Sequence, residues 1–313
     1  MDIIDPIVIA EADLVSCSIA IDADAADYGT DWQGAWTAGS YSSGDVVYKG
    51  IVIYESQNDS NMDDPEDGVS LDVPTWLELG WVNRWRIFDD YISNSSSSDI
   101  DEMVHTLAIS NADHISFYDV LANEMTVEIL DTTDAVVWEY SIDLLEGSLD
   151  YGDWWEYYYL PYPDSKRDIV VELGWMLNAA LGEKVRITFT GSGEVSCGMC
   201  IPGLAINLGQ THWSFEAGAL DYSETSTDAW GRSKFLEGPS AKLLRGSIRI
   251  PQGSESYVYR ILSGVQGKPV VFNFNNTGIY YDMMSVYGSI ADFQHVLYSG
   301  RKAICSIQIK GLI

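Results

Sequence analysis

The sequence predicts a mainly β protein with three parts: a small aromatic β unit, a β-sandwich of jelly-roll type and a C-terminal α+β part. Short segments rich in β-branched and aromatic residues recur between turn residues from 104 to 190, which is typical of antiparallel sandwiches. Segment 256–264 has apolar residues at helical spacing and lies between strand-like segments. With 313 residues and 46% hydrophobic residues, the chain is long enough for two or three domains. The expected boundaries are 1–90, 91–200 and 201–313.

The composition is strongly acidic, with 17 Lys and Arg, 47 Asp and Glu and a formal net charge of −30. This charge argues against binding nucleic acid through its phosphates and against docking on anionic lipid. Acids interrupt the N-terminal residues and the first basic residue is Lys49, so we expect no secretory signal. No apolar run approaches the length of a membrane span, so we expect no membrane insertion.

The region 1–90 opens with strand-like segments at 3–9 and 14–20. Asp22, Asp24 and Asp27 then form an acidic cluster. Calcium binds several oxygens from one loop, but the spacing here does not match an EF-hand. We expect a solvated turn in preference to a cation site.

Residues 31–80 form a compact aromatic unit. Two strands on either side of Lys49-Gly50 predict a β-hairpin, and an acidic loop over 58–68 follows. The order of Trp36, Tyr-x-x-Gly-Asp-Val-Val, Gly-x-x-x-Tyr54 and Trp76 resembles the small carbohydrate-binding modules of bacterial chitinases over about fifty residues. The resemblance implies that Trp36, Tyr54 and Trp76 are glycan-binding candidates, because aromatic faces stack on sugar rings. The loop that offers an exposed aromatic in that family is acidic here, so a scaffold module without ligand stays an alternative.

The stretch 76–90 holds three Trp, one Phe and two of the few arginines. An aromatic segment with arginines that can pair with carboxylates is suited to join two domains. We therefore expect Trp81, Arg84, Trp85 and Arg86 at a domain or subunit junction, and favour a joining core segment over a ligand site.

A wider resemblance is to tail proteins of long-tailed bacteriophages. It rests on Trp76-x-x-x-Gly80-x-x-Asn83-Arg84-Trp85-Arg86-x-Phe88-Asp89, on Leu208-Gly209-Gln210-Thr211, on Asp221-Tyr222-Ser223 with Trp230-Gly231, and on the closing segment 305–313. The resemblance implies a structural component of the distal tail or baseplate, located in the virion and assembled in the host cytoplasm. Its expected partners are copies of itself and other tail proteins, with a host cell-surface glycan as a further candidate.

Within 91–200, Asn94 and the serines 95–98 predict a flexible hinge. The run 151–162 is the densest aromatic segment, and 154–160 is expected to be a strand with rings on both faces. We favour a subunit contact through Trp154, Trp155 and Tyr157 over a sugar site, because aromatics are enriched at interfaces. The other strands expected after residue 90 are 104–109, 114–120, 125–130, 135–142, 169–173, 185–190, 241–250, 270–274, 283–290 and 304–309.

No pattern in the sequence predicts catalysis. Cys197-Gly-Met-Cys200 has no second Cys pair or His pair that would complete a zinc site, and the four histidines are far apart. There is no Gly-x-Ser-x-Gly elbow, P-loop or dinucleotide fingerprint. We expect no cofactor, no metal and no enzymatic activity. The alternatives to a tail structural protein are a free glycan-binding protein and, less favoured, a glycan-degrading tail enzyme.

Overall fold

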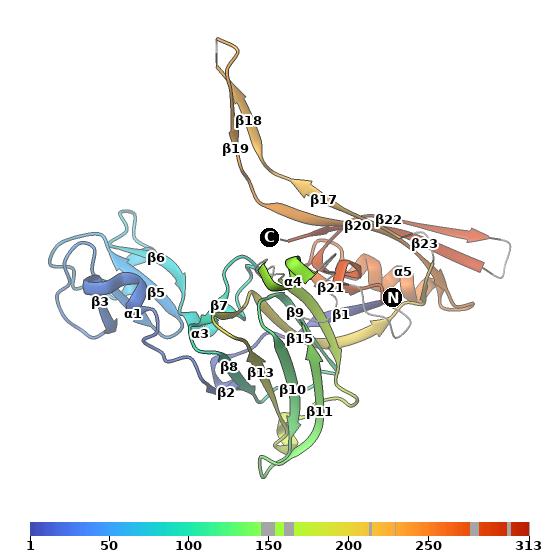
Figure 1. Cartoon of the computed structure of the whole chain (residues 1–313), viewed down its shortest axis with the longest axis horizontal. Helices are drawn as coiled ribbons and strands as arrows, with labels where there is room; N and C mark the ends of the chain where they lie inside the picture. Colours follow the sequence, from blue (N-terminus) through green and yellow to red (C-terminus); the bar gives the residue numbers. More distant parts are fainter. Residues whose placement is uncertain are drawn as a thin grey trace.

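The structure is a computed structural model, and it describes residues 1–144, 154–159, 166–212, 215–228, 230–275, 282–298 and 302–312. Antiparallel sheets dominate it, which confirms the mainly β class (Figure 1). The helical segments are short: α1 (Ala25–Tyr28), α2 (Pro65–Val69), α3 (Asn83–Arg86), α4 (Trp154–Tyr159), α5 (Glu255–Val265), η1 (Glu11–Asp13), η2 (Gly29–Asp31), η3 (Ala179–Leu181) and η4 (Asp282–Met284). Among the described residues, no helix is both long and apolar enough to cross a membrane.

The small module is a four-stranded sheet. Its strands are, in order across the sheet, β3 (Trp32–Ala35), β4 (Val46–Lys49), β5 (Val52–Ser56) and β6 (Trp76–Trp81). β4 and β5 pair antiparallel around Lys49-Gly50, as the sequence predicts, and Gly50 takes the positive φ that a tight turn needs. Gly68 of α2 lies against Trp76, and a Cβ there would be 2.4 Å from the indole Cδ1. The sheet, α2 and the acidic loop therefore enclose a small core of their own.

A five-stranded sheet forms one layer of the β-sandwich. Its order is β11 (Val136–Asp143), β10 (Glu124–Leu130), β13 (Lys184–Thr190), β8 (Glu102–Leu107) and β2 (Leu14–Cys17). Residues of β13 alternate between half-buried and buried, as expected for a strand with one face on a core. The buried side chains of this sheet pack with those of β9 and β12 in one cluster, so the two layers share a core.

The second layer belongs to a ten-stranded sheet that continues into the C-terminal part. Its order is β12 (Arg167–Glu172), β9 (His114–Val120), β15 (Met199–Asn207), β1 (Asp2–Pro6), β21 (Val270–Asn273), β22 (Ser285–Tyr298), β23 (Lys302–Gly311), β20 (Ser240–Ile250) and β16 (Gln210–Thr211), with β17 (Glu216–Asp221) also paired to β20. Val258 and Leu262 of α5 pack into the core of the C-terminal part. The division of the chain at residues 90 and 200 stays a prediction. Strand β1, from the first part, forms sheet hydrogen bonds with β15 and β21, which lie beyond these boundaries.

The contact between β1 and β15 depends on Gly203. A Cβ at this position would lie 2.5 Å from the Asp5 carbonyl oxygen and 2.5 Å from Cγ2 of Ile4. We expect Gly203→Ala to lower the free energy of unfolding by about 2 kcal/mol, because overpacking forces the strands apart. Urea unfolding measures the loss. Gly218→Ala is the matched control, since its Cβ would meet only the Leu243 carbonyl oxygen at 3.8 Å; equal losses in both variants would contradict this reading.

Two predicted segments differ from the structure. The predicted hinge at 94–98 is wrong over its last three residues. Ser96–Ser98 form strand β7, which pairs with β14 (Val195–Cys197), and Ser96 is fully buried. The predicted strand at 154–160 is also wrong, because Trp154–Tyr159 form helix α4. The Trp154 and Tyr158 rings stack at 6.3 Å across one helical turn, an i, i+4 contact that a strand cannot make.

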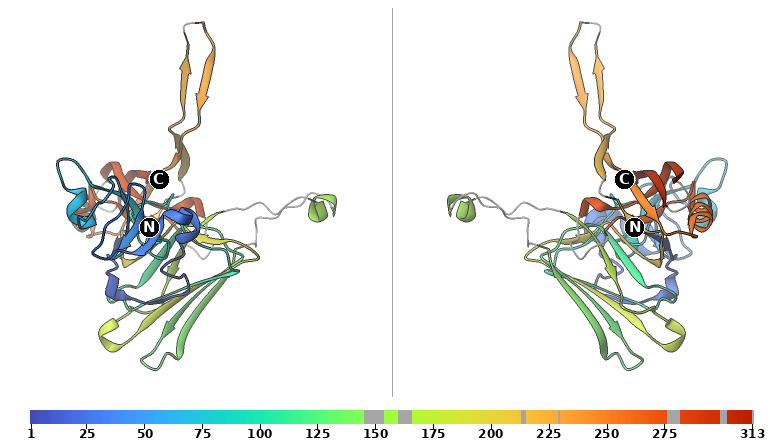
Figure 2. Two further views of the ribbon diagram at one scale, coloured as in Figure 1. Left: turned by 90° about the vertical axis from the view of Figure 1, so that its left-hand side faces the viewer. Right: turned by 90° about the vertical axis from the view of Figure 1, so that its right-hand side faces the viewer.

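A hairpin projects from the C-terminal sheet. It consists of β18 (Glu224–Thr227) and β19 (Ser233–Leu236), and it continues the ribbon formed by β17 and β20. Figures 1 and 2 show the hairpin pointing away from every other sheet. All eight of its strand residues are exposed.

Candidate functional site

The segment after β6 connects the core of the small module to the core of the sandwich. Trp85 is 5% exposed and packs in the module-side cluster with Val82. Ile87 is fully buried in the sandwich cluster, and Phe88 contacts both clusters. The Trp85 and Phe88 rings meet edge to face, with 5.7 Å between centroids. The structure therefore places this segment between the two cores.

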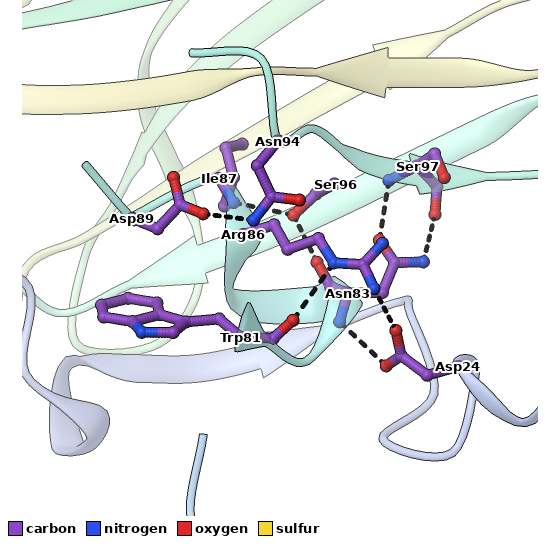
Figure 3. Close-up of polar contacts among 9 residues, drawn as sticks. All are labelled: Asp24, Trp81, Asn83, Arg86, Ile87, Asp89, Asn94, Ser96 and Ser97. Carbon is purple, nitrogen blue, oxygen red and sulfur yellow. Dashed lines mark hydrogen bonds and ion pairs between the residues drawn. The ribbon is translucent and has the colours of Figure 1, made fainter. Parts of the chain in front are cut away.

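An ion pair fixes α3 to the N-terminal turn that precedes the module. Arg86 Nη2 donates to Asp24 Oδ1 at 2.6 Å, and its Nε donates to the Trp81 carbonyl oxygen at 3.1 Å (Figure 3). Asp24 Oδ2 accepts the backbone N–H of Asn83 at 2.9 Å. Asp24 is 1% exposed, so the predicted solvated turn is wrong at this residue. Burial raises the pKa of the Asp24 carboxyl, while the Asn83 N–H and Arg86 oppose that rise.

Asn83 binds the other side of α3 to strand β7. Its Nδ2 donates to the Ser97 carbonyl oxygen at 2.9 Å, and its Oδ1 accepts the Ser97 N–H at 2.8 Å (Figure 3). The Ser96 hydroxyl accepts the Ile87 N–H at 2.8 Å. The ion pair between Arg86 and Asp24 holds α3 to the N-terminal turn, and the bonds to Ser96 and Ser97 hold it to β7.

Arg84 differs from Arg86, although the sequence predicts an acid partner for both. Within the described part of the chain, no carboxylate lies within ion-pairing distance of Arg84, and its Nε is buried without a hydrogen bond. Its carbonyl oxygen lies 3.3 Å from Nε2 of His105, which is fully buried. Burial lowers the pKa of His105 to about 4, and the nearby Arg84 charge acts in the same direction.

His105 is expected to make stability depend on pH. Its pKa rises from about 4 in the fold to the ordinary 6.5 on unfolding, so the neutral form favours the folded state. The contribution is complete above pH 6.5 and is lost as the pH falls towards 4, a loss of about 3 kcal/mol. Urea unfolding at both ends of this window measures it. His105→Gln is expected to remove this pH-dependent part of the free energy of unfolding. His114→Gln is expected to retain it, and His114 is paired with Asp113. The same pH dependence in His105→Gln and the unmodified chain would contradict the assignment.

The predicted glycan-binding aromatics do not form one open platform. Tyr54 and Trp76 are 6% and 0% exposed and belong to the module core, so neither offers a ring face to a sugar. The prediction that Tyr54 and Trp76 bind a glycan together with Trp36 is therefore corrected. Trp36 is half-buried, and Lys49 Nζ lies 5.3 Å from its ring centroid. A glycan-binding role stays a prediction for Trp36 alone.

Three aromatic residues of α4 are exposed. Trp154, Trp155 and Tyr158 are 76%, 61% and 69% exposed. The side chain of Tyr157 lies outside the described residues. Exposed rings on a six-residue helix are compatible with the predicted subunit contact, which stays a prediction.

The projecting hairpin carries exposed apolar side chains and was not predicted from the sequence. Trp230 at its tip is 85% exposed, and Phe235 and Leu236 are 63% and 57% exposed. Asp228 pairs with Arg232 across the turn at 2.9 Å. A signal for this hairpin is present in the sequence: the turn residues Asp228 and Gly231 lie between two short segments, Glu-Thr-Ser-Thr at 224–227 and Ser-Lys-Phe-Leu at 233–236.

In the described ranges, no group of three or more His, Cys, Asp or Glu side chains could hold a metal ion. Cys197 and Cys200 are buried free thiols, and burial raises the pKa of each. Such thiols are weak nucleophiles because they are protonated near neutral pH.

No protein-family model and no curated protein matches the chain. Weak similarity to part of the chain is found for solved structures that include two of the lectin domain of lectinolysin. A mutant with Lewis b has 12% identity and a TM-score of 0.28 over 40% of this chain and 84% of that chain. The domain with Lewis B antigen has 13% identity and a TM-score of 0.26, and the match covers 39% of this chain and 83% of that chain. At these values the similarity carries no argument about function.

Proposed function

We propose that this chain is a structural subunit that assembles with copies of itself in the tail tip or baseplate of a long-tailed bacteriophage. The observation that carries the assembly role is the projecting hairpin. An isolated two-stranded hairpin is at best marginally stable in water, and all eight strand residues of this one are exposed. Phe235 and Leu236 lie on opposite faces of the ribbon, opposite Thr225 and Glu224 respectively. A neighbouring subunit that covers the hairpin would bury both.

The charge distribution favours contacts between unlike surfaces of two copies. Residues 240–313 hold eight Lys or Arg and three Asp or Glu, a net charge of +5. Residues 1–239 hold nine Lys or Arg and 44 Asp or Glu, a net charge of −35. A head-to-tail contact that brings the C-terminal part of one copy against the acidic part of the next is therefore attractive. Such contacts form a ring when the rotation between neighbouring copies closes.

The hairpin is suited to approach an acidic neighbour. Residues 222–239 carry three acids and two bases, a net charge of −1 in a chain of −30. The low net charge keeps the electrostatic repulsion between this ribbon and an acidic neighbour small. Assembly through it requires no cofactor, metal or catalytic residue, and we propose no enzymatic role.

The tail-tip setting rests on the family resemblance of the segment around Asn83-Arg84-Trp85-Arg86 and of the landmarks after it. Electron microscopy of tailed particles from a lysate that contains this chain, labelled with an antibody raised against it, tests the setting. Label at the distal end of the tail is the expected result. Particles without label, together with chain that stays free in the lysate, would favour the free glycan-binding protein instead.

A further inference from the structure

A pocket of about 270 Å³ lies between the sandwich and the C-terminal strands. Strands β9 and β12 provide Tyr118, Asp119 and Asp168, while β20 and β22 provide Lys242 and Tyr287. None of these residues is among the module aromatics or in the hairpin. The pocket is thus separate from the features described above.

The carboxylates of the pocket are positioned by an irregularity in the sheet. The register of β9 and β12 shifts between Arg167 and Ile169, and Asp119 has a φ of +57°. A bulge re-aims side chains, and such a backbone conformation is uncommon outside glycine. Here the Asp119 N–H donates to Asp168 Oδ1 at 3.1 Å, and the other Asp168 oxygen pairs with Lys242. The bulge therefore brings two carboxylates and one ammonium group to the same wall.

The carboxylates of this wall are paired. Asp168 pairs with Lys242, and Asp119 pairs with Lys166 at 2.5 Å. An anion or a cation would have to displace one of these partners, whereas a neutral polar molecule would not. The described residues also offer no group of three ligands for a metal ion. Carboxylates that each retain acceptor capacity, next to an ammonium donor, suit a ligand that carries several hydroxyl groups.

We propose that this pocket binds one neutral sugar ring of a glycan. Asp119 and Asp168 accept hydrogen bonds from ring hydroxyls, and Lys242 donates one. The C–H face of the ring lies against the apolar part of the lining, to which Tyr287 and Leu312 contribute. Glycan binding at this place is independent of self-assembly, so either proposal can fail while the other holds.

Saturation-transfer NMR on the full chain tests the proposal. The probes are D-glucose, D-galactose, D-mannose and N-acetyl-D-glucosamine, each at about 10 mM, which suits millimolar affinity. We expect saturation transfer to at least one of these sugars. No transfer to any of the four would overturn the proposal.

Four variants locate the binding site. Ser93 is exposed at the rim, so Ser93→Trp is expected to close the pocket and reduce the transfer at least tenfold. Ser256→Trp, the same change at an exposed serine of α5, is expected to leave it unchanged. Asp119→Asn keeps a side chain that tolerates positive φ and is expected to weaken binding about tenfold, because a charged acceptor is lost. Transfer that persists in Ser93→Trp but disappears in Trp36→Ala would place the site on the module and overturn the assignment.

Discussion

Arg86→Ala is expected to lower the free energy of unfolding by about 3 kcal/mol. The substitution leaves the Asp24 carboxylate, 1% exposed, without its ion-pair partner, and an uncompensated buried charge is strongly destabilising. It also removes the hydrogen bond to the Trp81 carbonyl oxygen. Urea unfolding followed by tryptophan fluorescence measures the loss, since Trp81 and Trp85 lie at this junction.

Arg84→Ala is the matched control. Arg84 lies in the same helix but has no ion pair within the described residues, so its removal is expected to cost less than about 1 kcal/mol. The double variant Asp24→Ala with Arg86→Ala is expected to cost less than the sum of the two single losses, because each single change leaves one unpaired charge. Equal losses in Arg84→Ala and Arg86→Ala would show that the ion pair does not hold the junction.

Replacing Phe235 and Leu236 together by serine is expected to weaken self-association about a hundredfold or more. Each apolar side chain contributes about 1.5 to 3 kcal/mol when it is fully buried, and a loss of about 3 kcal/mol corresponds to a factor of about a hundred. The stability of the isolated subunit is expected to stay within about 0.5 kcal/mol of its original value, because both side chains are exposed and absent from the described cores. Sedimentation velocity gives the association constant, and urea unfolding gives the stability.

Val8→Ser is the control for the loss of an exposed apolar side chain. Val8 is 90% exposed and lies outside the hairpin, so association should be unaffected. A similar weakening by Val8→Ser would indicate nonspecific hydrophobic association. Full association of the Phe235 and Leu236 variant would exclude the hairpin as the contact.

Local pattern predicted the regular elements well. The strand expected at 185–190 is β13, Lys184–Thr190, because its residues alternate between two environments. The helix expected at 256–264 is α5, Glu255–Val265, because its apolar spacing matches a helix. Helix α4 was missed, since Trp and Tyr favour strands in general and nothing local shows that a partner strand is lacking.

Contacts between distant residues could not be predicted in this way. The sequence marked 76–90 as a joining segment, but it did not indicate that Asp24, 62 residues before Arg86, would be the buried partner. Ser96–Ser98 read as a hinge because their partner strand β14 lies far along the chain. The aromatic order around Tyr54 and Trp76 identified a module, yet it did not reveal that both rings point into its core.

The mass of the full chain in solution tests the assembly role most directly. Sedimentation velocity over a wide range of concentrations is the measurement. The assembly proposal predicts species at integral multiples of 34.7 kDa that grow with concentration and are lost when the hairpin is altered. A single species of 34.7 kDa at every concentration would contradict it.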